Sequence, residues 1–350
     1  MAKTETKVSM LNAIRDIASD NYRNLVPLAT TANLANVGNP ILSYQAVMNE
    51  FIQLLVNKVG LTIVRAREAK NPLAMLKKGT MPLGLDVEEI AVNPATATQY
   101  NAQSTDLLAQ TDPDVKAAYH RMNRQDRYAV TIQFVTLRQA FTSWEKFDVL
   151  IDEIVNSLYS GNYIDEFALT KKLLGSGVTD GKIQTQEITL PTDAATGRAF
   201  TTALRAAYMN FGFPSANYNS WALNQGTGDP FITWSDPSRI NLILRSDIAA
   251  LIDVEVLAAA FNMSKADFLG RVIYVDNFDE ATNVFAIICD EAFTQIYDVA
   301  NEFREFNNGS NLTINYYYHV WQIYSLSPLA NALAFIAPTT EGGGGEGGGT

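Results

Sequence analysis

One stretch near the end of the chain, residues 315–324, constrains the fold most strongly. Its sequence, NYYYHVWQIY, alternates as a β-strand does and carries bulky side chains on both faces. One face presents Tyr316, Tyr318, Val320 and Tyr324, and the other presents Tyr317, His319, Trp321 and Ile323. A strand that is covered on both faces lies at the centre of a domain, beside other strands and beneath a helix. We therefore expect Tyr318 and Trp321 to belong to a structural core.

A helix that begins near residue 143 is the best candidate to cover this strand. Ser143 is a suitable N-cap, and a second helical run at 164–174 follows Gly161-Asn162, either as a separate helix or as the continuation of one long, slightly broken helix. Gly175-Ser-Gly is expected to end it. The apolar side chains of the first run recur on one face: Trp144, Phe147, Ile151, Ile154 and Leu158. We expect this stripe to pack against the aromatic strand.

The remaining pattern is typical of an α+β chain. We expect an irregular arm at 21–39, helices at 41–58 and 194–210, and strands at 127–141, 241–245, 271–275, 284–289, 294–299 and 329–337. Cys289 falls in the apolar run VFAIIC and is expected to be a buried, inert thiol. The tail EGGGGEGGGT is expected to be flexible, because it has no apolar side chain to bury.

Residues 59–92 read as a hairpin with little apolar surface. An alternating strand at 61–68 is followed by Asn71-Pro72 and by a returning strand at 83–92. From Lys58 to Lys78 there are six basic residues and one acidic residue, in a chain whose net charge is −11. Two interpretations stay open: an ordinary solvated hairpin, or a basic arm that projects and docks on the acidic surface of a neighbouring copy. The second predicts intersubunit contacts through Arg65, Arg67, Lys77 and Lys78.

Charge and motif content argue against several classes of function. The acidic chain is unsuited to general binding of phosphate backbones, and no lysine or arginine follows Asn311, which argues against a base-stacking platform on the aromatic strand. The two histidines have no HExxH spacing, and neither GxSxG nor GK[ST] occurs. The single cysteine excludes an intrachain disulfide framework and a cysteine-based zinc site. No signal peptide or membrane-spanning run is evident. We expect no catalytic residue, no cofactor and no metal.

Five stretches spread along the chain resemble one family. They are NYRNLVPLA from Asn21, NPLAMLKKGTMPLG with VEEI at 71–90, YHRMNRQDRY at 119–128, DVEVLAAAFNMSKADFLG from Asp253 and YYYHVWQIYSLSPLANALAF at 316–335. Through them the chain resembles the major capsid proteins of the phi-29 group of short-tailed phages, whose fold is the capsid fold named after phage Hong Kong 97. The expected order of a hairpin, a long helix, an α+β unit and a late returning strand agrees with that fold.

The resemblance implies a division of the chain into the parts of that fold. The N-terminal arm is expected at 1–57, the E-loop hairpin at 58–95, the P-domain at 96–197 with a spine helix at about 143–174, and the A-domain at 198–305. The strands at 306–337 return to the P-domain, and the flexible glycine-rich tail occupies 338–350. Some relatives carry an immunoglobulin-like domain after the last strand. Because this sequence passes at Ala337-Pro338 into the glycine tail, we expect no role attached to that domain.

The resemblance also implies a function. Such a protein assembles as pentamers and hexamers into an icosahedral shell around double-stranded phage DNA, in the virion capsid, after assembly in the cytoplasm of the bacterial host. Scaffolding protein and portal protein are the implied partners, with no membrane. The net negative charge of the chain suits a shell that does not hold packaged DNA tightly. Two alternatives stay open: an encapsulin-type nanocompartment, which uses the same fold around an enzyme cargo, and an α+β enzyme with an unrecognised site.

Overall fold

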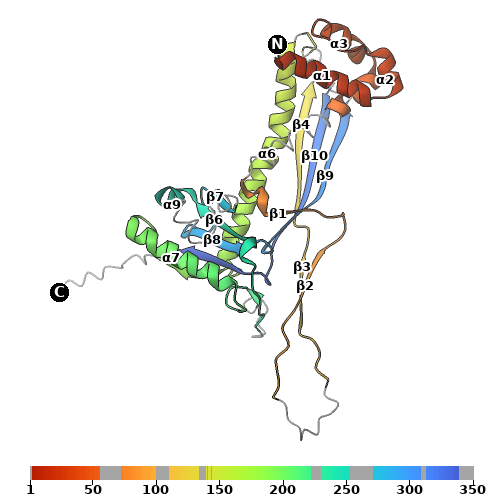
Figure 1. Cartoon of the computed structure of the whole chain (residues 1–350). Coiled ribbons are helices and arrows are strands. Elements are labelled where there is room, and N and C mark those ends of the chain that lie inside the picture. Colours follow the sequence, from red (N-terminus) through yellow and green to blue (C-terminus); the bar gives the residue numbers. More distant parts are fainter. Residues whose placement is uncertain are drawn as a thin grey trace, which may run out of the picture. The chain divides into compact units, whose positions relative to one another are not determined.

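The computed structural model describes residues 2–55, 72–99, 110–133, 139, 141–142, 144–221, 230–252, 271–308 and 313–338. Most of its helices and strands are labelled in Figure 1. The chain divides into two compact units. Unit 1 consists of Met1–Ala74, Arg124–Phe167 and Asp298–Gln322, and unit 2 consists of Met75–Asn123, Ala168–Tyr297 and Ile323–Thr350. Each unit has its own core and is described by itself.

Unit 1 begins with helices whose apolar faces are buried. They are α1 (Ala2–Ile17), α2 (Asp20–Leu25) and α3 (Leu34–Ser43), and residues 45–55 are also helical. The expectation of an irregular arm at 21–39 is therefore wrong for 21–25 and 34–39, which are helical, and holds for 26–33. Ser19 caps α2 by accepting a hydrogen bond from Tyr22 N. The burial of Leu34, Val37 and Ile41 stabilises α3 in spite of Pro40 inside it, because tertiary packing outweighs helix propensity.

A four-stranded sheet of order β1-β9-β10-β4 carries the aromatic strand. Its members are β1 (Lys77–Thr80), β9 (Thr294–Asn308), β10 (Thr313–Leu326) and β4 (Arg124–Gln133). β10 and β4 are antiparallel, with Tyr318 opposite Tyr128. The expected strand at 315–324 and its position between two other strands are thus confirmed. In unit 1, Tyr316, Tyr318 and Val320 share a core with helical residues that include Ile14 and Phe51.

The two faces of β10 are covered unequally. Tyr316, Tyr318, Val320 and Gln322 are buried, whereas Tyr317, His319 and Trp321 are half-buried. The structure therefore departs from the expectation that Trp321 lies in the core. Part of this second face is covered by a cation rather than by an apolar layer, because the guanidinium carbon of Arg127 lies 5.1 Å from the ring centroid of Tyr317.

The long helix α6 (Trp144–Thr179) is continuous over 36 residues. It passes through Gly161-Asn162 without a break and continues past Gly175, so the expected end at Gly175-Ser-Gly is wrong. In unit 2 the glycines serve close packing instead: a Cβ at Gly177 would lie 2.5 Å from Leu326 Cδ1, and one at Gly175 would collide with the carbonyl oxygen of Phe278. Ser143 and the side chains of the predicted apolar stripe, from Trp144 to Leu158, lie outside the described part.

Unit 2 is built on a five-stranded sheet of order β5-β11-β8-β6-β7. The strands are β5 (Gln184–Glu187), β11 (Ala332–Ile336), β8 (Val284–Asp290), β6 (Ile240–Arg245) and β7 (Val272–Val275). β8 is antiparallel to β11 and to β6, while β5 and β7 are parallel to their neighbours. The expected strands at 241–245, 271–275, 284–289 and 329–337 are confirmed.

Among the described residues of unit 2, helices α7 and α9 accompany this sheet. In α7 (Ala194–Phe211), Phe200 is fully buried and packs edge-on against Phe285 and Phe335, with ring centroids 5.2 and 5.4 Å away. Asp193 caps α7 by accepting hydrogen bonds from Ala195 N and Thr196 N. The short α9 (Ser246–Leu251) follows β6 directly. The expected helix at 194–210 is confirmed.

Unit 2 also carries a two-stranded antiparallel hairpin. β2 (Val87–Val92) pairs with β3 (Val115–His120), and Ile90 lies opposite Ala117. The strand expected to return at 83–92 is present as β2. Its described partner is β3, however, and the expected outgoing strand at 61–68 lies outside the described residues.

Candidate assembly surface

The two faces of the β2–β3 hairpin have different surroundings. On one face, Ala91 and Ala118 pack against a small cluster of Trp221, Phe231 and Leu329. Lys116 lies on the same face, with Nζ 5.9 Å from the centroid of the Trp221 ring and 2.7 Å from Asp114 Oδ1. This face therefore attaches the hairpin to the rest of unit 2.

The opposite face, here called the hairpin face, exposes a row of apolar side chains. The exposed fraction is 61% for Ile90, 55% for Val92, 50% for Val115 and 59% for Tyr119. The register brings them together, since Val92 lies opposite Val115 and Tyr119 lies opposite Glu88. Tyr119 donates a hydrogen bond of 2.9 Å to Glu88 Oε1. Apolar side chains that gather on an exposed surface mark a site for a binding partner.

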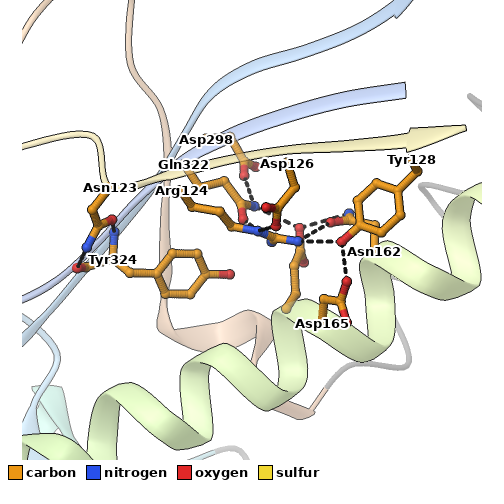
Figure 2. A network of polar contacts seen from close by, with 10 residues as sticks. Asn123, Arg124, Asp126, Tyr128, Asn162, Asp165, Asp298, Gln322 and Tyr324 are labelled. Carbon is orange, nitrogen blue, oxygen red and sulfur yellow. Dashed lines mark hydrogen bonds and ion pairs between the residues drawn. The ribbon is translucent and has the colours of Figure 1, made fainter. Parts of the chain in front are cut away.

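Polar side chains fix both ends of the hairpin. Beyond β2, Asn93 donates to Pro230 O at 2.9 Å and accepts from Ile232 N at 2.9 Å. At the other end, buried His120 contacts Ser325 Oγ at 2.7 Å and Glu89 Oε2 at 3.2 Å. Asn123 forms two hydrogen bonds with the backbone of Tyr324, at 2.7 and 2.8 Å (Figure 2). The hairpin face is thus held in a defined position within unit 2.

The basic residues predicted for intersubunit contact are not brought together in the described structure. Arg65 and Arg67 lie outside the described residues, and Lys77 begins β1. Lys78 is engaged inside its own unit, where it donates to Glu291 O at 2.5 Å and where burial lowers its pKa. Lys78 is thus partly engaged within unit 2, and its contact with a neighbouring copy stays a prediction. Sequence reasoning missed the hairpin face, although the alternation of apolar residues in VEEIAV and VKAAYH carries the signal.

A buried arginine organises the interior of unit 1 (Figure 2). Arg124 in β4 is 5% exposed, and its guanidinium contacts Asp126, Gln322, Tyr128 and Asn162. Gln322 in β10 in turn donates to Glu166 of α6 at 2.7 Å and to Asp298 of β9 at 2.6 Å. We call this set of side chains the Arg124 network. It ties α6 to three strands of the sheet.

Tyr128 extends the Arg124 network toward α6. Its hydroxyl accepts from Arg124 at 2.7 Å and donates to Asp165. Burial raises the pKa of Tyr128, and the hydrogen bond to Asp165 raises it further, so the phenol stays protonated and remains a donor at neutral pH. Gly161 allows this approach of helix and strand, because a Cβ there would lie 3.1 Å from the Tyr128 ring.

In unit 2 a buried lysine plays a comparable part. Lys171 of α6 is buried, and its Nζ lies 2.8 Å from Asp276 Oδ1, 3.2 Å from Asn277 Oδ1 and 3.4 Å from Asp279 Oδ1. Partial burial by itself raises the pKa of Asp276. The hydrogen bonds from Lys171 and from backbone groups outweigh burial and lower that pKa. Lys171 thus fixes the loop at 276–279 to the helix.

The described residues bring no metal-binding cluster of side chains together. No group of three histidine, cysteine or carboxylate side chains in the described ranges is placed to hold a metal ion. Cys289 lies in β8 and is fully buried, and burial raises the pKa of its thiol to about 12, as expected of an inert side chain. None of the helices in the described part is long and apolar enough to cross a membrane.

The fold places the chain in a known class of proteins. Among solved structures, it is similar to the capsid of Staphylococcus phage Andhra, with a TM-score of 0.60 at 15% identity over 77% of this chain and 84% of that one. A chain in the structure of the head fiber and inner core protein gp22 of native bacteriophage P68 gives a TM-score of 0.58 at 14% identity over 76% of this chain and 84% of that one. At these identities the similarity shows the fold, which is the Hong Kong 97-type α+β capsid fold.

Sequence comparison identifies the family. Residues 11–336 match the profile of the Phi29-like phage major capsid protein, so the chain belongs to that family. It is 37% identical to the major capsid protein of Bacillus phage PZA, over 94% of this chain and 72% of that protein. It is also 28% identical to the major capsid protein of Streptococcus phage Cp-1, over 94% of each. The chain is thus a phage major capsid protein that forms an icosahedral shell, and the comparisons support this function over the encapsulin and enzyme alternatives.

Proposed function

We propose that copies of this chain associate as pentamers and hexamers, and that these build the icosahedral shell around double-stranded phage DNA. The observation that carries this proposal is the hairpin face, where Ile90, Val92, Val115 and Tyr119 are each at least half exposed on one side of a fixed two-stranded ladder. A surface of this kind is stabilised when a partner removes it from water. In a shell-forming family the abundant partner is another copy of the chain.

The charge of the chain supports a DNA container rather than a DNA-binding protein. The net charge is −11, so DNA phosphates are repelled on average and are not held by counterion release. The genome can therefore enter and leave without many strong contacts to break. We propose that the DNA is enclosed without sequence-specific binding, and that the chain has no catalytic role.

The remaining partners follow from membership of the family. We propose that a scaffolding protein guides closure, that a portal protein occupies one vertex, and that assembly takes place in the cytoplasm of the bacterial host. Arg65, Arg67, Lys77 and Lys78 stay candidates for contact with a neighbouring copy. We further propose that the E-loop includes both β2 and β3, and so extends to residue 120 rather than ending at 95. In this assignment α6 is the spine helix of the P-domain, and residues 338–350 are a dispensable tail.

Imaging tests the proposed function directly. The purified chain, expressed alone and together with scaffolding and portal proteins from its phage, is examined by negative-stain electron microscopy and by nuclease protection. The expected result is closed icosahedral particles whose DNA resists nuclease when packaging components are present. Particles filled with a protein cargo, or a chain that stays monomeric under all these conditions, would contradict the proposal.

A further inference from the structure

Unit 2 exposes a second apolar surface, at the end of α7. Met209 and Phe213 are 55% and 62% exposed, and Trp234 is 57% exposed. Trp234 belongs to the same surface region, because Ser235 N donates to Phe211 O at 2.7 Å and the backbones of Ser215 and Thr233 pair with each other. We call Arg205, Met209, Phe213 and Trp234 the α7 surface.

The α7 surface and the hairpin carry opposite charge. Helix α7 contains Arg198 and Arg205 and no acidic residue, and neither guanidinium has a hydrogen-bond or ion-pair partner among the described residues. Arg205 lies one helical turn before Met209, so the two side chains are neighbours. Residues 81–120, which contain the hairpin, hold six acidic residues and a single lysine, Lys116. Opposite charges around two apolar surfaces favour their association and fix its register.

A contact within a ring of copies would bring the hairpin face against a different surface. If two hairpin faces paired with each other, the contact would be self-complementary and would close at a dimer. A ring of five or six copies needs a contact between two different surfaces, repeated head to tail. Both surfaces are exposed in the same unit, so neither is covered by the other within one chain.

From these observations we infer that the hairpin face of one copy packs on the α7 surface of the next copy in the ring. Ile90, Val92, Val115 and Tyr119 form the apolar centre with Met209, Phe213 and Trp234. Glu88, which is exposed beside Tyr119, pairs with Arg205 at the edge. An apolar centre with a charged rim is the usual composition of a protein–protein interface. The inference rests on the proposed function and specifies the contact that the shell would use.

Cysteine cross-linking separates this arrangement from its alternatives. Val92→Cys and Met209→Cys are introduced into the full chain singly and together, and assembled particles are oxidised and analysed by denaturing gel electrophoresis. The native Cys289 is fully buried and its thiol pKa is raised, so it should not form cross-links of its own. The expected result is a ladder up to pentamers and hexamers in the double variant and monomers in each single variant. Dimers from Val92→Cys alone, or monomers from the double variant, would overturn the inference.

A charge exchange provides the second test. Glu88→Arg and Arg205→Glu should each lower the yield of particles by about tenfold, because like charges then face each other across the contact. Combined in one chain, the two changes restore the opposite charges and should return the yield to within about twofold of the unmodified chain. A combined variant no better than the worse single variant would overturn the pairing. If the unmodified chain forms no particles, the proposed function fails; normal particles from all variants contradict only this contact.

Discussion

The sheets of the two units bury different kinds of side chain. In unit 2 the sheet is apolar, and all seven residues of β8, VFAIICD, are buried. In unit 1 the buried face of β10 begins with Tyr316, Tyr318 and Val320 but continues into Gln322, which is fully buried and belongs to the Arg124 network. An apolar interior tolerates several packing arrangements, whereas a hydrogen-bonded network is satisfied in one register only. We conclude that the sheet of unit 2 relies on hydrophobic burial, and that the sheet of unit 1 also relies on directional contacts.

The largest effect is expected from the apolar core of unit 2. Replacing Phe200 by Ala removes a fully buried ring that packs on Phe285 and Phe335, and should cost about 3–5 kcal/mol in the free energy of unfolding. Chemical denaturation of the purified chain measures this change. Phe213→Ala, on the exposed α7 surface, is the matched control. It should leave the free energy of unfolding within about 0.5 kcal/mol of the parent value.

The next largest effect is expected from the Arg124 network. Arg124→Leu leaves Gln322, Tyr128 and Asn162 without their buried donor. The change should cost about 3 kcal/mol in the free energy of unfolding. This is the lower end of the range for breaking a buried ion pair, because the partner Asp126 is 44% exposed. Arg124→Lys keeps the charge but loses the planar fork of donors, so it should recover only part of this loss. Equal stability of the leucine variant and the parent would show that unit 1 does not depend on directional contacts.

A smaller effect is expected on the half-buried face of β10. Trp321→Ala removes a side chain that is only partly covered, so it should cost about 1–2 kcal/mol, less than the loss of a fully buried aromatic side chain. Tyr318→Ala, on the buried face of the same strand, is the comparison and should cost more. Thermal melting of the two variants ranks them. A larger loss for Trp321→Ala than for Tyr318→Ala would mean that the two faces have been assigned the wrong way round.

The smallest effect is expected from Lys171 and Asp276. Because the pKa of Asp276 is lower in the folded than in the unfolded chain, its contact with Lys171 stabilises the fold above the unfolded pKa, about 4, and this contribution is lost as the pH falls further. Asp276 is 59% exposed, so the contribution near pH 7 should be below about 1 kcal/mol. Urea unfolding of Asp276→Asn and the parent, repeated between neutral pH and pH 3, measures it. The difference should vanish at the acidic end; a difference that grows on acidification would contradict this sign.

The sequence predicted the interior of unit 2 better than that of unit 1, because apolar burial can be read from a local pattern and a buried polar network cannot. Continuous apolar runs such as NLILR and VFAIIC, and the amphipathic α7, reveal buried elements directly. Nothing in the local pattern around Arg124 or Gln322 indicates burial, because a buried polar group depends on partners that are distant in the sequence. Gly161-Asn162 and Gly175 read locally as breaks, yet in α6 they allow close contact with Tyr128 and with Phe278. Trp321 was assigned to the core because both faces of the strand carry bulky side chains, whereas in the structure only the face with Tyr318 is buried at this level and Trp321 is half-buried.

The sequence predicted a hairpin as the candidate assembly surface, but it did not predict which residues of the hairpin form that surface. A hairpin that contacts a neighbouring copy was expected from the basic segment at 58–78, whose central part lies outside the described residues. The described hairpin is acidic and offers apolar side chains instead. Its pairing joins residues 87–92 to residues 115–120, and such a long-range pairing cannot be read from either segment alone.

Particle formation by a variant of the hairpin face is the most direct test of the claim that this surface drives assembly. Ile90→Ser combined with Val92→Ser removes exposed apolar side chains without disturbing the core, so the subunit should melt at the temperature of the parent. The control is Leu251→Ser, which removes a side chain that is 57% exposed on α9. Sedimentation velocity and electron microscopy should then show particles for the parent and the control, and unassembled subunits for the hairpin variant. Normal particles from the hairpin variant would contradict the claim.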